Sequence, residues 1–121
     1  MDDYNKLRGQ LYSAVLENNK SKNFVDRMYN KGKYPALYDE SGNPMTHKMM
    51  NVSIGGKEMV LPTVVYDDGK LKELTPQEAI HFAMTRGEYI EFDSALEARD
   101  FANNGYKEAF PKGYFSSGWK K

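Results

Sequence analysis

A pair of adjacent glycines, Gly55 and Gly56, constrains the fold of this chain more strongly than any other feature of its sequence. The pair separates two largely apolar runs, residues 49–54 and 57–66. Two consecutive glycines can both adopt the positive φ angles that a two-residue turn between antiparallel strands requires. The sequence therefore predicts a β-hairpin over residues 49–66.

Further turn signals extend the β region on both sides of this hairpin. The Asp-Asp-Gly stretch 67–69 predicts a second tight turn before a short extended segment at 70–74. Residues 34–38 are also expected to be extended, before a dense turn signal at 39–44. Pro62 cannot donate a ladder hydrogen bond, so we expect its strand to lie at a sheet edge or to be interrupted there.

Two capping patterns predict short helices after the β region. The stretch 75–78 has threonine, then proline at the first helical position, and glutamate three residues after the threonine. The stretch 94–97 repeats the pattern, with serine as the cap and glutamate three residues later. Gly87 and Gly105 are expected to end these two helices.

The first 31 residues predict helix, divided by the weak helix formers of residues 18–23, with Gly32 as a stop. Their apolar residues Tyr4, Leu7, Leu11 and Val15 are spaced three and four apart, and so form one stripe. The stripe could pack on the chain's own sheet, or it could bind a groove of another subunit. Packing on the chain's own core is the default expectation.

These signals together predict an α+β fold in one chain. Its parts are a helical arm (1–33), an α+β module with a small antiparallel sheet of hairpins and two short capped helices (34–105), and an extended aromatic tail (106–121). Tyrosine and tryptophan bury a large area at a small entropic cost, which favours them at interfaces. The stripe and the tail are therefore the candidate partner-binding surfaces. The aromatic residues of the tail are Tyr106, Phe110, Tyr114, Phe115 and Trp119.

Composition narrows the classes of protein to which the chain can belong. Its 121 residues suit one domain, and 17 basic residues balance 17 acidic ones. A broad nucleic-acid footprint would need a basic excess, although residues 20–33 form a local basic stretch. The absence of cysteine excludes disulfides and thiolate metal sites. No apolar run approaches the roughly 20 residues of a membrane span, and the first residues lack a signal-peptide core.

Catalytic and metal-binding chemistry has little support in the sequence. His47 and His81 are the two histidines, whereas a zinc site needs three or four converging ligands. The adjacent carboxylates at 39–40 and 67–68 lie in turns, where they rarely face each other across a cleft. We therefore expect no catalytic residue, no metal and no cofactor, and we expect that the chain is not an enzyme.

Residues 43–102 resemble a module that recurs in bacteriophage virion proteins, including internal or ejection proteins and tail-associated proteins. The shared pattern runs from Asn-Pro through Leu-Pro-Thr-Val, a second glycine turn, Glu-Ala and Gly-Glu to Phe-Asp-Ser before a last helix. The resemblance implies that the matching positions form the scaffold. These positions are Asn43, Pro44, Gly55, Gly56, Pro62, Thr63, Gly69, Thr75, Pro76, Glu78, Gly87, Phe92, Ser94 and Glu97.

The resemblance implies a virion-associated structural or assembly protein that acts through protein–protein contacts. Its partners would be portal, tail, capsid or internal proteins, with multiple copies in a symmetric assembly, and it would be made in the host cytoplasm. Two alternatives stay open. One is a phage nucleic-acid-binding accessory protein that uses the basic stretch and the aromatic tail. The other is a small phage protein that binds and inhibits a host enzyme.

Overall fold

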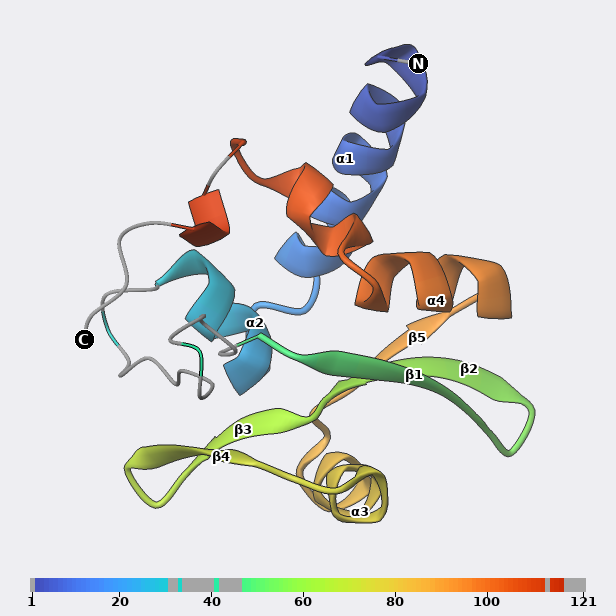
Figure 1. Cartoon of the computed structure of the whole chain (residues 1–121). Coiled ribbons are helices and arrows are strands. Elements are labelled where there is room, and N and C mark those ends of the chain that lie inside the picture. The colour runs from blue at the N-terminus through green and yellow to red at the C-terminus, as the bar shows by residue number, and fades with distance from the viewer. Residues whose placement is uncertain (1, 31–32, 34–40, 42–46, 113, 117–121) are drawn as a thin grey trace.

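The structure is a computed structural model that describes residues 2–30, 33, 41, 47–112 and 114–116. Two helices precede four strands, and the chain then alternates helix, strand and helix before two short 3₁₀-helices (Figure 1). The elements are α1 (Asp2–Glu17), α2 (Asn23–Tyr29), β1 (Met49–Ile54), β2 (Lys57–Pro62), β3 (Val64–Asp67), β4 (Lys70–Glu73), α3 (Pro76–Arg86), β5 (Ile90–Phe92), α4 (Ala95–Ala102), η2 (Gly105–Ala109) and η3 (Tyr114–Ser116). The predicted α+β fold is confirmed. The predictions for residues 34–40, Gly32, Asn43, Pro44 and Trp119 lie outside the described residues.

The strands form two small antiparallel sheets. One has the order β1-β2-β5, and the other pairs β3 with β4. The predicted turns are confirmed, because Gly55 and Gly56 have φ angles of 58° and 81°, and Asp68 and Gly69 have φ angles of 56° and 81°. Positive φ at both central residues is the geometry that matches the twist of a two-residue hairpin.

The chain passes from the first sheet to the second at Thr63. Pro62 pairs with Met49 of β1, but β5 pairs only with residues 58–60 of β2, so Pro62 has a single neighbouring strand. Thr63 then donates its N–H to Lys48 O at 2.9 Å and accepts from Leu74 N at 2.7 Å. The predicted interruption near Pro62 is thus confirmed. Strand β5 was not predicted, because three residues are too few to show an alternating pattern.

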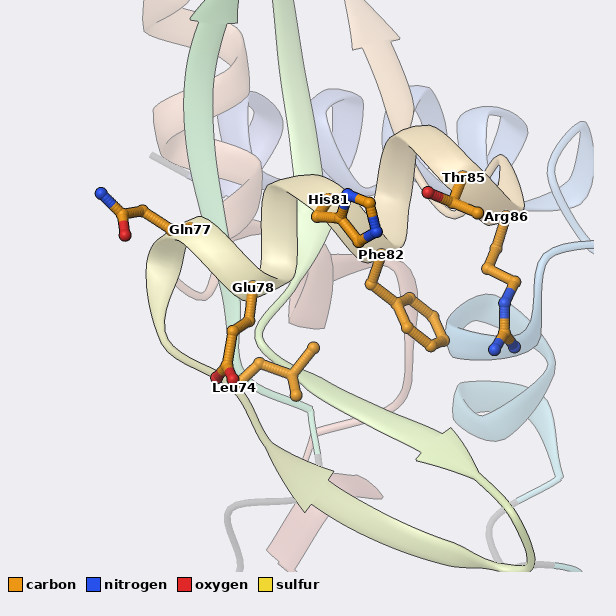
Figure 2. Close-up of a pocket in the computed structure, with 7 residues that line it drawn as sticks. All are labelled: Leu74, Gln77, Glu78, His81, Phe82, Thr85 and Arg86. Atoms are coloured by element: carbon orange, nitrogen blue, oxygen red, sulfur yellow. The ribbon is translucent and has the colours of Figure 1, made fainter.

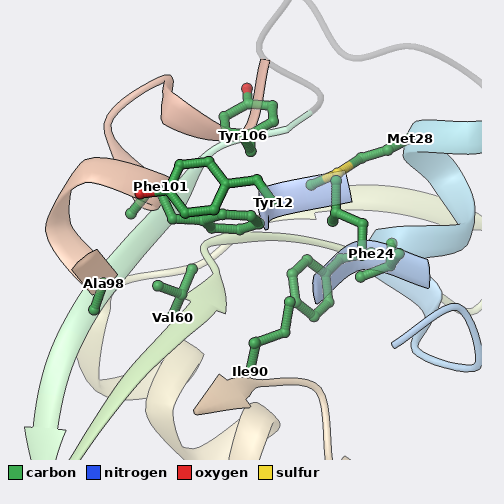
Figure 3. Packing of buried hydrophobic residues seen from close by; sticks show 11 residues of the cluster. Tyr12, Phe24, Met28, Val60, Ile90, Ala98, Phe101 and Tyr106 are labelled. Atoms are coloured by element: carbon green, nitrogen blue, oxygen red, sulfur yellow. The ribbon is translucent and has the colours of Figure 1, made fainter. Parts of the chain in front are cut away.

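The three-stranded sheet is covered on both faces (Figure 1). Adjacent residues of β2 point to opposite faces: Val60 joins a large cluster with α1, α2 and α4, while Leu61 joins a smaller one with Ala79 and Ala83 of α3. Figure 3 shows the large cluster around Val60. Its buried members are Tyr12, Leu16, Phe24, Val25, Met28, Val60, Ile90, Ala98, Phe101, Ala102 and Tyr106. The predicted arm, module and tail therefore share one core.

The predicted capping box is confirmed at the start of α3, where Thr75 Oγ1 accepts from Glu78 N at 3.2 Å and Glu78 Oε1 accepts from Thr75 N at 2.9 Å. At the start of α4 only half of the predicted box forms: Ser94 Oγ accepts from Glu97 N at 3.1 Å, but Glu97 Oε1 accepts from the Ser94 hydroxyl and not from its backbone N–H. The backbone N–H of Thr75 holds the pKa of the Glu78 carboxyl below its usual value. Gly87 ends α3 with a φ of 71°.

The predicted stop at Gly105 was wrong. Helix α4 ends at Ala102, and Asn104 takes the left-handed conformation with a φ of 80°. Gly105 instead begins η2, in a place where a Cβ atom would lie 2.4 Å from the backbone oxygen of Asp100. Close approach of the backbone, and not helix termination, requires glycine at this position.

Candidate protein-binding surfaces

Helix α1 carries an exposed apolar stripe, defined here as Tyr4, Leu7 and Leu11. Their exposed fractions are 62%, 65% and 49%, respectively. Val15, the fourth residue of the predicted stripe, is partly buried against the core. The expectation that the stripe packs on the chain's own core was therefore wrong for three of its four residues.

A different side of α1, about a third of a turn away, anchors the helix to the rest of the molecule. Tyr12 and Leu16 are buried in the core. Gly9 lies so close to η2 that a Cβ atom there would be 2.4 Å from the backbone oxygen of Glu108. This close contact and the two buried side chains fix the rotation of α1, so that the stripe faces outward.

Polar contacts support the same orientation. Asp100 accepts a 2.7 Å hydrogen bond from Tyr12 Oη and a 3.1 Å bond from Arg8 Nη1, and Arg8 Nη2 lies 3.5 Å from Glu108 Oε2. Burial and the Asp100 hydrogen bond both raise the pKa of the Tyr12 hydroxyl. The cation of Arg8 is thus neutralised by two carboxylates beside the stripe.

The aromatic tail is more compact than predicted. Tyr106 is 5% exposed, and burial raises its pKa to about 12, so its ring is a core residue and the prediction that it binds a partner was wrong. Phe110 and Phe115 pack against the core, and Phe110 stacks on Tyr114 at 4.8 Å between ring centroids. Tyr114 Oη donates to Met28 O at 2.7 Å. These contacts hold η2, Phe110 and η3 against α2 and the core.

In the described part of the basic stretch at 20–33, three of the four cations (Lys20, Lys22, Arg27 and Lys33) are buried or paired within the chain, and Lys22 is the exception. Arg27 is 1% exposed and donates to Val64 O at 2.7 Å and to Asn23 Oδ1 at 3.0 Å. Lys20 pairs with Glu17 at 2.8 Å, and Lys33 pairs with Asp26 at 3.6 Å. Burial and internal pairing therefore reduce the free positive charge of the described residues; Lys31 lies outside them.

A second apolar surface, here called the α3 groove, lies along the outer side of α3. It is an open pocket of about 410 Å³ lined by Leu74, Gln77, Glu78, His81, Phe82, Thr85 and Arg86. Figure 2 shows Leu74, Phe82 and Arg86 on the side of α3 that faces the β3–β4 hairpin. The Arg86 guanidinium lies over the Phe82 ring at 4.7 Å and 3.5 Å from Asp67 Oδ1.

Nothing in the sequence predicts this groove. Ala79, Ile80, Ala83 and Met84 are spaced so that they share one face of α3, and Phe82 lies outside that face. A single aromatic residue outside the buried face is common on protein surfaces and predicts no site by itself. In the structure Ala79 and Ala83 are buried, but Met84 is exposed.

Glu88, a residue outside the predicted scaffold positions, has a structural role. It follows the predicted stop at Gly87 and caps α2 by accepting from Asn23 N at 2.9 Å and Phe24 N at 3.0 Å. Phe92, one of the predicted scaffold positions, packs against the large core cluster. His47 packs edge-to-face on Phe115, and the exposed His81 lines the α3 groove. Within the described ranges, no group of three or more His, Cys, Asp or Glu side chains is placed to hold a metal ion.

Comparison of the chain with protein-family models, with curated proteins and with solved structures finds no match. Among the described residues, no helix combines the length and the apolar character needed to cross a bilayer.

Two surfaces stand out on the described part of the chain: the exposed stripe of α1 and the α3 groove.

Proposed function

We propose that this chain is a non-catalytic structural or assembly protein of a bacteriophage particle, and that it works by protein–protein contact through the α1 stripe. The observation that carries this proposal is the outward exposure of Tyr4, Leu7 and Leu11 on one side of a helix. Large apolar side chains gathered on one exposed face mark an interaction site more often than scattered ones do.

The spacing of these residues also suggests the mode of contact. Positions 4, 7 and 11 follow the three- and four-residue steps by which an amphipathic helix anchors itself in a groove. The partners in this proposal are other virion proteins, such as portal, tail, capsid or internal proteins, and the site of synthesis is the host cytoplasm. The particle context rests on the resemblance of residues 43–102 to the virion module.

The nucleic-acid alternative has weaker support. Binding to the phosphate backbone depends on free lysine and arginine side chains. Arg27 is buried, and Lys20 and Lys33 pair with acidic residues of the same chain. The host-enzyme alternative would use the same kind of protein contact as the virion proposal, so experiment must separate those two.

The test compares the wild-type chain with the double variant Leu7→Lys/Leu11→Lys in cells producing the phage. We expect quantitative mass spectrometry of purified particles to find the wild-type chain, and to find the variant reduced by about tenfold or more, because lysine ammonium groups resist burial in an apolar contact. Gln10→Lys, an exposed position of the same helix outside the stripe, is the matched control and should be incorporated normally.

Two results would overturn the proposal. The first is the absence of the wild-type chain from purified particles. The second is normal incorporation of the double variant. Recovery of the wild-type chain bound to one host enzyme, together with its absence from particles, would favour the inhibitor alternative instead. Circular dichroism of each purified variant establishes that the substitutions have left the fold intact.

A further inference from the structure

Strand β1 forms an outer edge of the three-stranded sheet, because β2 lies on one side of it and no described strand lies on the other. Its six residues pair with β2 without a bulge. Thr63 N donates to Lys48 O, which places the backbone groups of the even-numbered residues on the β2 side, since the side alternates along an antiparallel pair. Met49, Asn51 and Ser53 therefore direct their N–H and C=O groups outward. Among the described residues, none donates to or accepts from these outward groups.

The other three edges of the described sheets are protected against pairing. Strand β5 has only three residues, and Glu91 Oε1 on it lies 3.4 Å from Lys57 Nζ. On the outer side of β3, Val64 O accepts from the buried Arg27 at 2.7 Å. In β4, three of the four residues are charged. Short length, a covering group and charge are all means by which proteins block a sheet edge.

Strand β1 has none of these protecting features. Its sequence, Met-Met-Asn-Val-Ser-Ile, contains no charged residue and no proline. An unprotected edge of this length accepts one further antiparallel strand through backbone hydrogen bonds. The edge thus calls for an extended strand as its occupant, and not for a helix or a small molecule.

The side chains of β1 narrow the sequence of that strand. Met50 and Val52 are partly buried against the small cluster on the α3 face of the sheet. A neighbouring strand extends this cluster if its residues on the same face are apolar. Strand β1 itself meets this requirement, because its residues 50, 52 and 54 are apolar and share one face. It also brings no charge to the contact.

We propose that the β1 strands of two copies pair antiparallel about a two-fold axis and join the two three-stranded sheets into one. With the axis at Asn51, residues 49–53 of both strands are fully paired and form about six backbone hydrogen bonds. Met50 of each copy then lies opposite Val52 of the other, and no like charges face each other across the axis. A contact made by the same surface of both copies is isologous and closes at a dimer.

The helices of the two copies have compatible places in this dimer. In Figure 1, α3 and α4 lie against opposite faces of the sheet, and neither replaces a strand at its edge. The two-fold axis of an antiparallel strand pair is normal to the sheet. Both α3 helices therefore lie on one face of the joined sheet, and both α4 helices lie on the other. The contact goes beyond the proposed function, because it uses β1 and leaves both α1 stripes exposed.

Exchange of charge at Asn51 tests both the occupant and the register. Asn51→Lys and Asn51→Glu each place two like charges across the axis, so each variant alone should dimerise at least about tenfold more weakly than wild type. An equimolar mixture of the two variants should restore the dimer, because the axis then brings a lysine and a glutamate together. Asn51→Thr keeps the backbone N–H and adds no charge, so this matched control should dimerise like wild type. Analytical ultracentrifugation over a range of concentrations measures each association.

Amide exchange of the wild-type chain gives a second readout that needs no substitution. Exchange of the N–H groups of Asn51 and Ser53, followed by NMR, should slow as the protein concentration rises, because these groups are hydrogen-bonded only in the dimer. The N–H groups of Met50 and Val52 already bond to β2, so their exchange should change less. Leu7→Lys/Leu11→Lys should dimerise like wild type, since the α1 stripe takes no part in the contact.

Three results would overturn the paired β1 edges. They are a wild-type chain that stays monomeric, exchange at Asn51 and Ser53 that does not depend on concentration, and a folded mixture of the two charge variants that does not dimerise. Loss of the dimer in Leu7→Lys/Leu11→Lys would also contradict the proposal and would indicate a contact through the α1 stripes. The proposed function is tested separately, by the entry of the α1 variant into particles.

Discussion

Glu88 connects two helices that are far apart in the sequence. It follows the left-handed Gly87 that ends α3, and its two carboxylate oxygens accept from Asn23 N and Phe24 N at the start of α2. The residue before α2, Lys22, makes no side-chain cap of its own. The N-terminal N–H groups of a helix have no partner within the helix, so Glu88 satisfies donors that would otherwise be unpaired.

Glu88→Ala should therefore destabilise the protein. Loss of a helix cap typically costs ~1 kcal/mol, and two N–H groups are affected here, so we expect a loss of about 1–2 kcal/mol. Urea denaturation followed by circular dichroism measures the change. Glu91→Ala is the control, because Glu91 is exposed and pairs with Lys57 at 3.4 Å, a surface contact worth about 0–1 kcal/mol. Equal losses in the two variants would contradict the capping role.

Gly9→Ala should lower the stability of the protein, although a glycine-to-alanine change inside a helix usually raises it. Alanine is the better helix former by about 1 kcal/mol, so propensity alone predicts that Gly9→Ala stabilises α1. A Cβ atom at this position would lie 2.4 Å from Glu108 O, which is backbone and cannot rotate away. Overpacking commonly costs about 1–3 kcal/mol, so we expect a net loss of stability in thermal or urea unfolding. Gln10→Ala, at an exposed position of the same helix, should be neutral or slightly stabilising.

The buried hydroxyl of Tyr106 makes stability depend on alkaline pH. Burial raises its pKa from 10.0 to about 12. Between these values, the Tyr106 hydroxyl loses its proton in the unfolded chain and keeps it in the folded chain. The free energy of unfolding is therefore unaffected by this group below about pH 10, and it decreases as the pH rises toward 12. Urea unfolding of wild type and Tyr106→Phe at about pH 8 and about pH 11 should show a smaller alkaline loss in the variant, by about 1 kcal/mol. An identical alkaline loss in both proteins would contradict this account.

The orientation of α1 illustrates what local sequence can and cannot predict. The hairpin turns and the N-cap residues Thr75 and Ser94 were predicted correctly, because glycine pairs and N-terminal caps act on neighbouring residues. The buried side of α1 was not, since Tyr12 and Leu16 are spaced four apart just as Leu7 and Leu11 are. Contacts with residues distant in the sequence, among them Asp100 and η2, determine which of the two sides is buried.

Asp100 is the polar anchor of α1, and its removal should loosen that helix selectively. Asp100→Ala leaves the buried Tyr12 hydroxyl and the Arg8 guanidinium without their main acceptor. Leaving a buried donor unsatisfied costs about 1–3 kcal/mol, and we expect a loss in this range. In the variant, the rate of hydrogen–deuterium exchange relative to wild type should increase more in α1 and η2 than in the β1–β2 hairpin. Asp93→Ala, at an exposed position before α4, is the control; uniform acceleration over all elements in Asp100→Ala would contradict a local anchor.

Taken as one molecule, the chain has a core that crosses all three segments predicted from its sequence. Residues 34–105 contribute Val60, Ile90, Ala98, Phe101 and Ala102 to the large cluster, and the remaining buried members come from α1, α2 and Tyr106. The three segments were predicted from changes of composition along the sequence. Burial depends instead on which apolar faces of the helices and strands pack together. Residues 47–102 are therefore covered by side chains from outside that range, and the exposed α1 stripe lies on a helix that also completes the core.

The fragment 34–105 should consequently fail to fold when produced alone. Without residues 1–33 it loses the side chains that cover Val60 and Phe101, including Phe24, Val25 and Met28, which are at most 1% exposed in the whole chain. Each such buried side chain contributes about 1.5–3 kcal/mol, so the loss of several is comparable to the whole 5–15 kcal/mol by which domains are commonly stable. We expect poorly dispersed amide signals in two-dimensional NMR of the fragment, and native dispersion in a chain ending at Ser116, which retains Tyr106 and Tyr114. A 34–105 fragment that gave well-dispersed signals and unfolded cooperatively would contradict this prediction. It would show that the α+β module folds independently and that α1 and α2 are not needed for its core.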